Sequence, residues 1–486
     1  MAKHKLISSL SALDRKEMTR FAAFVHSPYH EKHKGVRVLI QYLSKRYPDF
    51  SGCTNAHLAE VVMTRANLAA GAFPPILTYA QRAFEQFLIQ EMLSEDSYQQ
   101  QLYLLRALRS HHLLKQYDRK HRSIMRALEA VQQKDTRYLR FQYELGVEAG
   151  DYFLLRERRT PDSSLQARQD ALDVYFISEK LRDACELAVR RHIVKGEYEQ
   201  AFLGPILEAI QEQPEYYGQI PAITVYHAVY EMLQQESTAY YFSALQSVQD
   251  NRKAFSVTEQ TLLYNYLMNY CIARINRNDT RFLQELFGLY KIQLSNDLLL
   301  EDGYLSEWDY KNIVTTALRL GDLTWAVSFI EEYRAALRPE ARDNAYRFNK
   351  AAYHYEAKEY DEVLGLLTQV EYSDLRYSLG TRALLMRTYY DLDEYEALHA
   401  LTESFRQYLQ RNKLMSDNRR LGYYNLFRLT RKAALLRSRL PYVRHEKAAR
   451  ELKRLQEEAD ATEAVFNRSW LTEKLEELAS QVTSGA

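Results

Sequence analysis

The sequence predicts an all-α fold, in which antiparallel helix pairs stack as a solenoid behind a small helical N-terminal domain. The 486 residues include only 15 Gly and 10 Pro, where ordinary usage is about 7% and 5%. Sheets with tight turns need both residues, whereas the abundant Leu, Ala, Glu, Arg and Gln favour helices. A further observation is a polar break that recurs at 35 to 37 residues towards the C-terminus.

We expect three parts along the chain. Residues 1–95 form the helical N-terminal domain, residues 96–440 the helical repeat array, and residues 441–486 the C-terminal capping helices. A chain of this length holds either a few ordinary domains or one long array of repeated units. The recurring breaks favour the array.

The N-terminal domain is predicted to contain four helices. Ser11, followed three residues later by Asp14, resembles a capping box and indicates the start of the first helix. Its apolar residues recur at the three- to four-residue spacing of an amphipathic helix: Met18, Phe21 and Val25. Pro28 ends this helix, because the residue before a proline is disfavoured in the helical region. A second helix stops before Pro48, a short third one follows, and a long fourth one opens near Pro75.

In the array, a short polar break precedes an aromatic residue or Leu that is predicted to open the next helix. These residues are Tyr117, Tyr198, Phe282, Leu323, Tyr360 and Tyr395. The last two intervals are close to the helix–turn–helix period of about 34 residues in tetratricopeptide repeats. The stretches "GDLTWAVSFIEEY", "AAYHYEAKEYDEVLGLL" and "LLMRTYYDLDEYEALHAL" resemble such repeats over residues 305–411. The resemblance implies a tetratricopeptide-like array.

The N-terminal region resembles a second family, a group of uncharacterised bacterial helical proteins. The resemblance is carried by Leu10-Ser11, Phe21 and Phe24, Ser27-Pro28-Tyr29, and Tyr47-Pro48-Asp49-Phe50. It implies a separate N-terminal domain and no particular activity.

Composition excludes several classes of protein. With 65 Lys and Arg against 64 Asp and Glu, the chain is nearly neutral, which argues against a general nucleic-acid coat. Three widely separated cysteines, Cys53, Cys185 and Cys271, cannot form a disulfide framework and fit a reducing compartment. The N-terminus lacks the apolar core of a signal peptide, and no apolar run is long enough to cross a membrane. We therefore expect a cytoplasmic protein without a membrane partner.

A cluster of possible zinc ligands opens the chain. His26, His30 and His33 precede Cys53 and His57, which are four residues apart and would share one face of a helix. Pro28 interrupts any helical face common to the first histidines, and the two-residue spacing of structural zinc sites is absent. We therefore predict a polar loop and no metal. The chain also lacks phosphate-binding and dinucleotide-binding glycine motifs, so we expect neither a cofactor nor an enzyme.

Charge is unevenly distributed along the chain. Residues 411–454 carry 14 Lys and Arg against 3 Asp and Glu, and residues 102–140 carry 10 against 3. In one interpretation these side chains cover helix surfaces and pair with acidic neighbours, including the acid-rich tail from Glu457 onward. In the other, they form a docking face for an acidic partner, which is either a protein or a nucleic acid.

One helix, predicted over residues 418–440, separates charge from apolar residues. At 100° per residue, five basic residues fall within an arc of roughly 120°, and these are the predicted binding residues: Arg420, Arg428, Arg431, Lys432 and Arg439. The residues gathered on the other side are Leu426, Leu429, Ala433, Leu436 and Leu440. One face is thus expected to pack on preceding helices while a basic stripe points outward.

These features favour a non-enzymatic adaptor or scaffold, because stacked helix pairs form extended surfaces that bind partners. The expected partner is a protein or peptide, and the basic stripe would suit an acidic one. The alternative is a nucleic-acid-associated regulator that uses the basic segments 102–140 and 411–454. The oligomeric state has no signal in the sequence.

Overall fold

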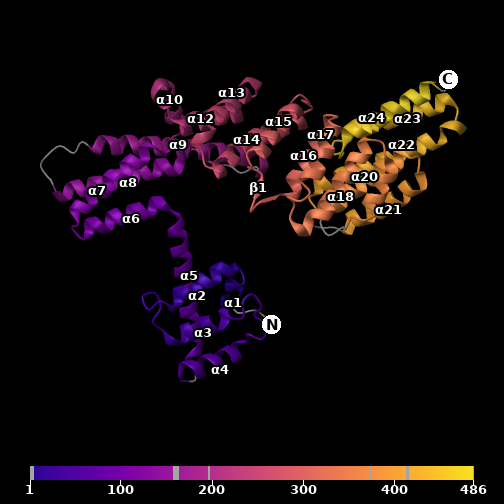
Figure 1. The fold of residues 1–486 in the computed structure, drawn as a ribbon. Helices are drawn as coiled ribbons and strands as arrows, with labels where there is room; N and C mark the ends of the chain where they lie inside the picture. Colours follow the sequence, from indigo (N-terminus) through magenta and orange to yellow (C-terminus); the bar gives the residue numbers. More distant parts are fainter. Residues whose placement is uncertain are drawn as a thin grey trace. The chain divides into compact units, whose positions relative to one another are not determined.

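The computed structural model describes residues 5–69, 71–156, 164–194, 198–370, 375–411 and 415–484. Helices α1 to α24 account for nearly all regular structure in these ranges (Figure 1). The single sheet found there is an antiparallel pair of two-residue strands, β1 (Leu300–Glu301) and β2 (Tyr304–Leu305). The predicted all-α fold class is therefore confirmed.

The chain divides into two compact units. Unit 1 comprises residues 1–183 and 201–223, and unit 2 comprises residues 184–200 and 224–486. The sequence-based boundaries after residues 95 and 440 stay predictions. None of the helices in the described ranges is both long enough and apolar enough to cross a lipid bilayer.

Unit 1 opens with a group of short and long helices. They are α1 (Lys5–Leu10), α2 (Arg15–His26), α3 (Lys34–Ser44), α4 (Asn55–Ala66) and α5 (Phe73–Glu95). A capping box does begin α2, but it consists of Asp14 and Glu17, each accepting a hydrogen bond from the backbone N–H of the other. Ser11 instead follows α1, and its hydroxyl donates to the carbonyl of Ile7 at 2.8 Å. The predicted start at Ser11 is wrong because Asp14 has the glutamate three residues later that a capping box needs.

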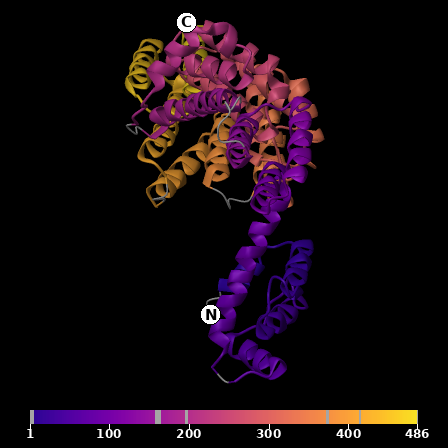
Figure 2. The same ribbon diagram turned by 90° about the vertical axis from the view of Figure 1, so that its left-hand side faces the viewer.

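The apolar stripe of α2 faces a core shared by these helices. Phe21 is fully buried, and its ring centroid lies 5.5 Å from that of Phe84 and 5.3 Å from that of Phe87. Met18 and Val25 are also buried in this core. Both partners of Phe21 come from α5, the long helix that runs alongside α2 and α3 (Figure 2).

The next helices run from the rest of unit 1 into unit 2. They are α6 (Ser97–Ser110), α7 (Leu114–Glu129), α8 (Thr136–Arg156), α9 (Ser164–Val194), α10 (Leu203–Glu212), α11 (Pro214–Tyr217), α12 (Pro221–Gln234), α13 (Thr238–Asp250), the 3₁₀ turn η1 (Arg252–Ala254), α14 (Val257–Asn276) and α15 (Phe282–Ser295). Phe282 opens α15 as predicted, and Tyr117 lies in the first turn of α7. Tyr198 opens no helix, so this prediction is wrong. The helix α10 begins only after Phe202, whose φ of 65° is left-handed and cannot continue a right-handed helix.

The C-terminal part of unit 2 consists of helices that contact their neighbours along the chain. Its elements are α16 (Glu307–Arg319), α17 (Leu323–Glu332), α18 (Pro339–Glu356), α19 (Tyr360–Leu367), α20 (Leu375–Asp391), α21 (Tyr395–Arg411), α22 (Asp417–Arg439), the 3₁₀ turn η2 (Leu440–Tyr442), α23 (His445–Ala461) and α24 (Arg468–Ser484). Leu323, Tyr360 and Tyr395 are the first residues of α17, α19 and α21, as the recurring breaks predict. Successive helices from α16 to α22 contact each other, and α16, α18, α20 and α22 also contact in series (Figure 1).

The last helix is attached to helices from earlier pairs. The indole Nε1 of Trp470 in α24 donates to the hydroxyl of Tyr355 in α18 at 2.8 Å. Four residues later, Lys474 Nζ lies 2.9 Å from Asp391 Oδ1 of α20. The Tyr355 hydroxyl also donates to Asp391. Together with the apolar residues that α23 and α24 share with α20 to α22, this network joins the C-terminal helices to the preceding pairs.

Candidate docking groove

Helix α22 follows the predicted division into two faces. It begins after Ser416 and ends at Arg439, close to the predicted bounds of 418–440, and Pro441 follows in η2. The predicted inner residues Leu426, Leu429 and Ala433 are fully buried. The outer face carries the five predicted basic residues.

Most of these basic side chains have acidic partners within the chain. Arg428 and Lys432 both bind Glu458 of α23, and the Lys432 Nζ–Glu458 Oε2 distance is 2.7 Å. Arg431 Nη1 lies 2.6 Å from Glu403 Oε1 of α21. These contacts support the interpretation in which basic side chains pair with acidic neighbours across helix surfaces.

The two ends of the stripe differ from its centre. Arg420 pairs with Asp417 of its own helix, one turn earlier. Arg439 is exposed at the last residue of α22. The structure therefore brings Arg428, Arg431 and Lys432 together above two carboxylates, and it leaves Arg420 and Arg439 at the two ends of the helix.

Glu458 is the acidic centre of this arrangement. The hydrogen bond from Lys432 holds the pKa of Glu458 below its usual range, against the effect of partial burial and with further help from Arg428. The carboxylate is therefore charged over the neutral pH range. Its side chain is 34% exposed, as is that of Glu403, so water and a binding partner can both reach these ion pairs.

The outer face also carries apolar side chains that the charge analysis missed. Leu421, Tyr424 and Leu435 are 50%, 40% and 48% exposed. A helical wheel drawn at 100° per residue places all three residues inside the arc of the basic stripe. This signal was present in the sequence, because a surface that is only solvated has no need for three large apolar residues on its polar side.

These residues line a groove between α21 and α22, which we call the basic groove. One cavity of about 330 Å³ is bounded by Glu403 and Arg406 of α21 and by α22 from Tyr424 to Leu435. A second, of about 490 Å³, continues along the same two helices to Leu421. A third, of about 240 Å³, lies on the other side of α22 against α23 and shares Lys432 and Leu435 with the first.

The floor of the basic groove is aromatic and apolar. Phe405 and Phe427 are buried, and their ring centroids are 4.2 Å apart. Leu409 is also buried beside them. The groove thus has an apolar floor, exposed apolar residues along its length and a charged rim.

The rim is basic overall, although its ion pairs neutralise part of the charge. The basic side chains lining the three cavities are Arg406, Arg420, Arg428, Arg431, Lys432, Arg439 and Arg454. The acidic ones are Glu403, Asp417, Glu451 and Glu458. Seven positive against four negative charges leave an excess of three, which favours an acidic ligand.

The other predicted basic segment, residues 102–140, contributes Tyr103 and Arg137 to a cavity of about 810 Å³. The charged side chains that line this cavity are Arg137, Glu95 and Asp96, so its lining has no basic excess. Arg109 of α6 binds the buried Glu148 of α8 through Nε at 2.7 Å and Nη2 at 3.0 Å. Arg137 lies 3.5 Å from Asp96, and Arg140 lies 3.1 Å from Glu144. Arg109 thus joins α6 to α8, and Arg137 joins α8 to the N-cap of α6, whereas the Arg140–Glu144 pair lies within α8. All three ion pairs have structural roles.

The histidines near the N-terminus each make a contact that has a structural role. The Nδ1 of His33 accepts from the backbone N–H of Gly35 and caps α3. His57 Nε2 lies 2.6 Å from the Tyr42 hydroxyl, and His30 stacks on Phe24 with centroids 4.0 Å apart. Within the part of the chain that the structure describes, no three His, Cys, Asp or Glu side chains are grouped as metal ligands.

Comparison of the chain with models of known protein families gave no match, and comparison with curated protein sequences gave none either.

Proposed function

We propose that this protein is a non-enzymatic adaptor that docks an acidic segment of a partner protein in the basic groove. The observation that carries the proposal is the combination of three exposed apolar residues with a basic rim on one face of α22. Leu421, Tyr424 and Leu435 would supply contact area, and Arg428 and Arg431 would supply charge. Tyr and Arg are the residue types enriched where binding energy concentrates in protein interfaces.

Single exposed apolar residues are normal on protein surfaces and need no explanation. What distinguishes α22 is that its exposed apolar residues share one face with the basic residues and lie above an aromatic floor. The helix pairs from α16 onward support the same proposal, because repeated helix pairs present extended surfaces suited to binding. A tetratricopeptide-like array remains our interpretation of these pairs.

A protein partner is favoured over a nucleic acid. Stacking of bases needs a series of exposed aromatic rings, and in the described lining of the groove Tyr424 is the exposed aromatic residue. The apolar residues Leu421 and Leu435 suit side chains of a protein.

A cytoplasmic location is part of the proposal. Cys53, Cys185 and Cys271 are all free and buried, and free thiols persist where the compartment is reducing. No membrane partner is proposed.

The test compares affinity purification with the wild-type chain and with the triple variant Arg428→Gln, Arg431→Gln and Lys432→Gln. We expect the variant to lose a protein partner while its circular dichroism spectrum is unchanged. The fold should persist because the orphaned carboxylates are partly exposed, and surface ion pairs contribute about 0–1 kcal/mol each. Retention of every partner by this variant would contradict the proposal.

A matched control removes three charges from the other basic segment. Lys115, Arg119 and Arg122 are exposed on α7, and changing all three to Gln should leave the partner bound. Each purification is repeated after nuclease treatment. Loss of binding on nuclease treatment, together with loss in the groove variant, would instead establish the nucleic-acid alternative.

A further inference from the structure

The residues along the outer face of α22 repeat with the spacing of a helical seam. Leu421, Tyr424, Arg428, Arg431 and Leu435 follow one another at intervals of three, four, three and four residues. This is the spacing of the positions through which two helices contact each other side by side. Arg420 and Lys432 lie on the two flanks of that seam, and Arg439 lies beyond its C-terminal end. Apolar residues thus form the two ends of the seam and basic residues form its centre.

The wall opposite the seam has a similar spacing. Thr402, Arg406 and Leu409 of α21 line the groove at intervals of four and three residues. A groove between two such rows accepts a third helix, because the side-chain ridges of one helix pack into the grooves of others. An amphipathic helix that places its apolar face in a groove is a common mode of peptide recognition.

The period of the seam discriminates between a helical and an extended ligand. Fourteen residues of α22 separate Leu421 from Leu435, which is about 21 Å at a rise of 1.5 Å per residue. The four intervals therefore average about 5.3 Å each, close to one helical turn. Side chains on one face of a strand repeat at about 6.7 Å, so an extended peptide would drift by about 6 Å over the seam. Its side chains would be about 3 Å out of register at the centre of the seam, and its fifth side chain would lie beyond Leu435.

We infer that the occupant of the basic groove is an amphipathic α-helix of about four turns, supplied by another protein. Its centre carries two carboxylates one turn apart, facing Arg428 and Arg431, and apolar residues lie on the same face at both ends. The inference rests on the proposed function, since it specifies the acidic segment that the groove accepts. The match of charge at the centre and of apolar residues at the ends also fixes the register of the helix.

Two carboxylates of the chain itself compete with this helix. Glu458 holds Arg428 and Lys432, and Glu403 holds Arg431. An incoming carboxylate must displace these contacts before it binds the same guanidinium groups. Removing the two competitors should therefore tighten binding, which is the opposite of what removing a residue needed only for the fold would do.

The experiment uses the full chain and synthetic peptides labelled with a fluorophore. The seam peptide is an 18-residue amphipathic helix with a Glu pair one turn apart in its centre and Leu residues at both ends of one face. A second peptide has the same composition with the Glu pair moved to the opposite face. A third has the seam sequence with a central proline, which breaks the helix. Fluorescence anisotropy gives the three affinities.

We expect the seam peptide to bind at least tenfold more tightly than the other two. The double variant Glu403→Gln and Glu458→Gln should bind it about two- to fivefold more tightly still, on the scale of exposed ion pairs. The control is Glu473→Gln with Glu476→Gln, which makes the same change in net charge at exposed positions of α24. This control variant should change the affinity for the seam peptide less than the double variant Glu403→Gln and Glu458→Gln does.

The outcomes separate this inference from the proposed function. Equal binding of the proline peptide and the seam peptide would overturn the helical occupant and leave an acidic segment in the groove. Failure of every peptide to bind, while the native partner is still lost in the triple Gln variant, would also overturn the inference alone. Binding of the seam peptide that is unaffected by Arg428→Gln and Arg431→Gln would place it outside the groove and contradict both.

Discussion

Replacing Lys474 with Met should destabilise the C-terminal part of unit 2 by about 3–5 kcal/mol. Lys474 and Asp391 form an ion pair at 2.9 Å, and their side chains are only 13% and 7% exposed. Removing one partner of a buried pair leaves the other charge uncompensated, which costs about 3–5 kcal/mol. Met keeps most of the apolar length of Lys, so the loss of packing is small.

The measurement at neutral pH captures the whole effect of this pair. Burial by itself would lower the pKa of Lys474, but the hydrogen bond and charge of Asp391, with smaller contributions from Glu477, raise it above its usual value. A cationic group whose pKa is higher in the folded state than in the unfolded state stabilises the fold. This contribution is fully present below the pKa of the group in the unfolded state, which is about 10.4 for Lys. That contribution is lost only as the pH rises through the folded pKa.

Trp470, one turn before Lys474, provides the probe. The other two tryptophans, Trp308 and Trp325, are changed to Phe so that fluorescence reports on α24 alone. Urea unfolding followed by this signal should show a midpoint lowered by about 1–2 M if the slope is about 3 kcal/mol per molar urea. The slope itself should be unchanged, since the surface exposed on unfolding is the same.

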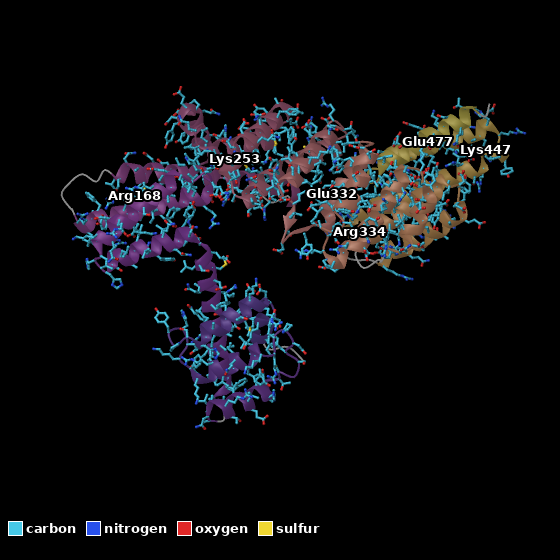
Figure 3. All side chains as sticks on the ribbon, in the orientation of Figure 1. Arg168, Lys253, Glu332, Arg334, Lys447 and Glu477 are labelled. Atoms are coloured by element: carbon cyan, nitrogen blue, oxygen red, sulfur yellow. The ribbon has the colours of Figure 1, made fainter. Side chains whose placement is uncertain are left out.

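The control substitution is Lys447→Met on α23, where the side chain is exposed (Figure 3). It should change stability by no more than about 0.5 kcal/mol. Adding Asp391→Asn to Lys474→Met should recover part of the loss, because the uncompensated charge is then removed. A Lys474→Met midpoint equal to that of Lys447→Met would refute the reasoning, and so would strictly additive effects in the double variant.

A buried carboxylate in unit 1 predicts a smaller loss: Glu148 is 2% exposed and bound by Arg109, but Arg106 lies 3.8 Å from it and remains after Arg109→Gln, so this change should destabilise the α6–α8 packing by about 1–3 kcal/mol. Hydrogen exchange of the amides in α6 and α8 measures this, and unchanged protection would contradict it. At acid pH, the hydrogen bond from Arg281 holds the pKa of Asp279 at about 2. A lowered pKa contributes stability that is present above about pH 4 and lost as the pH falls through the folded value. Asp279→Asn should therefore flatten the stability curve between about pH 4 and pH 2, whereas the exposed Asp361→Asn should not; identical curves for the two variants would rule this out.

Local sequence signals were sufficient to determine where several of these helices begin and which way α22 faces. The starts of α17, α19 and α21 at Leu323, Tyr360 and Tyr395 follow from breaks read directly from the chain. The buried face of α22 follows from a period of 3.6 residues, which is a property of the helix itself. Signals of this kind fail where neighbouring residues compete, as Ser11 and Asp14 do at the start of α2.

The partners of the charged residues were decided by the tertiary structure. Glu458 lies 30 residues after Arg428 and Glu403 lies 28 residues before Arg431, while 83 residues separate Asp391 from Lys474. A helical wheel fixes the direction of a side chain about its own axis, but it does not say which other helix lies in that direction. The wheel places Leu421, Tyr424 and Leu435 on the outer side of α22, but it does not say whether another helix covers that side. The packing of α21, α22 and α23 decides that these three residues remain exposed.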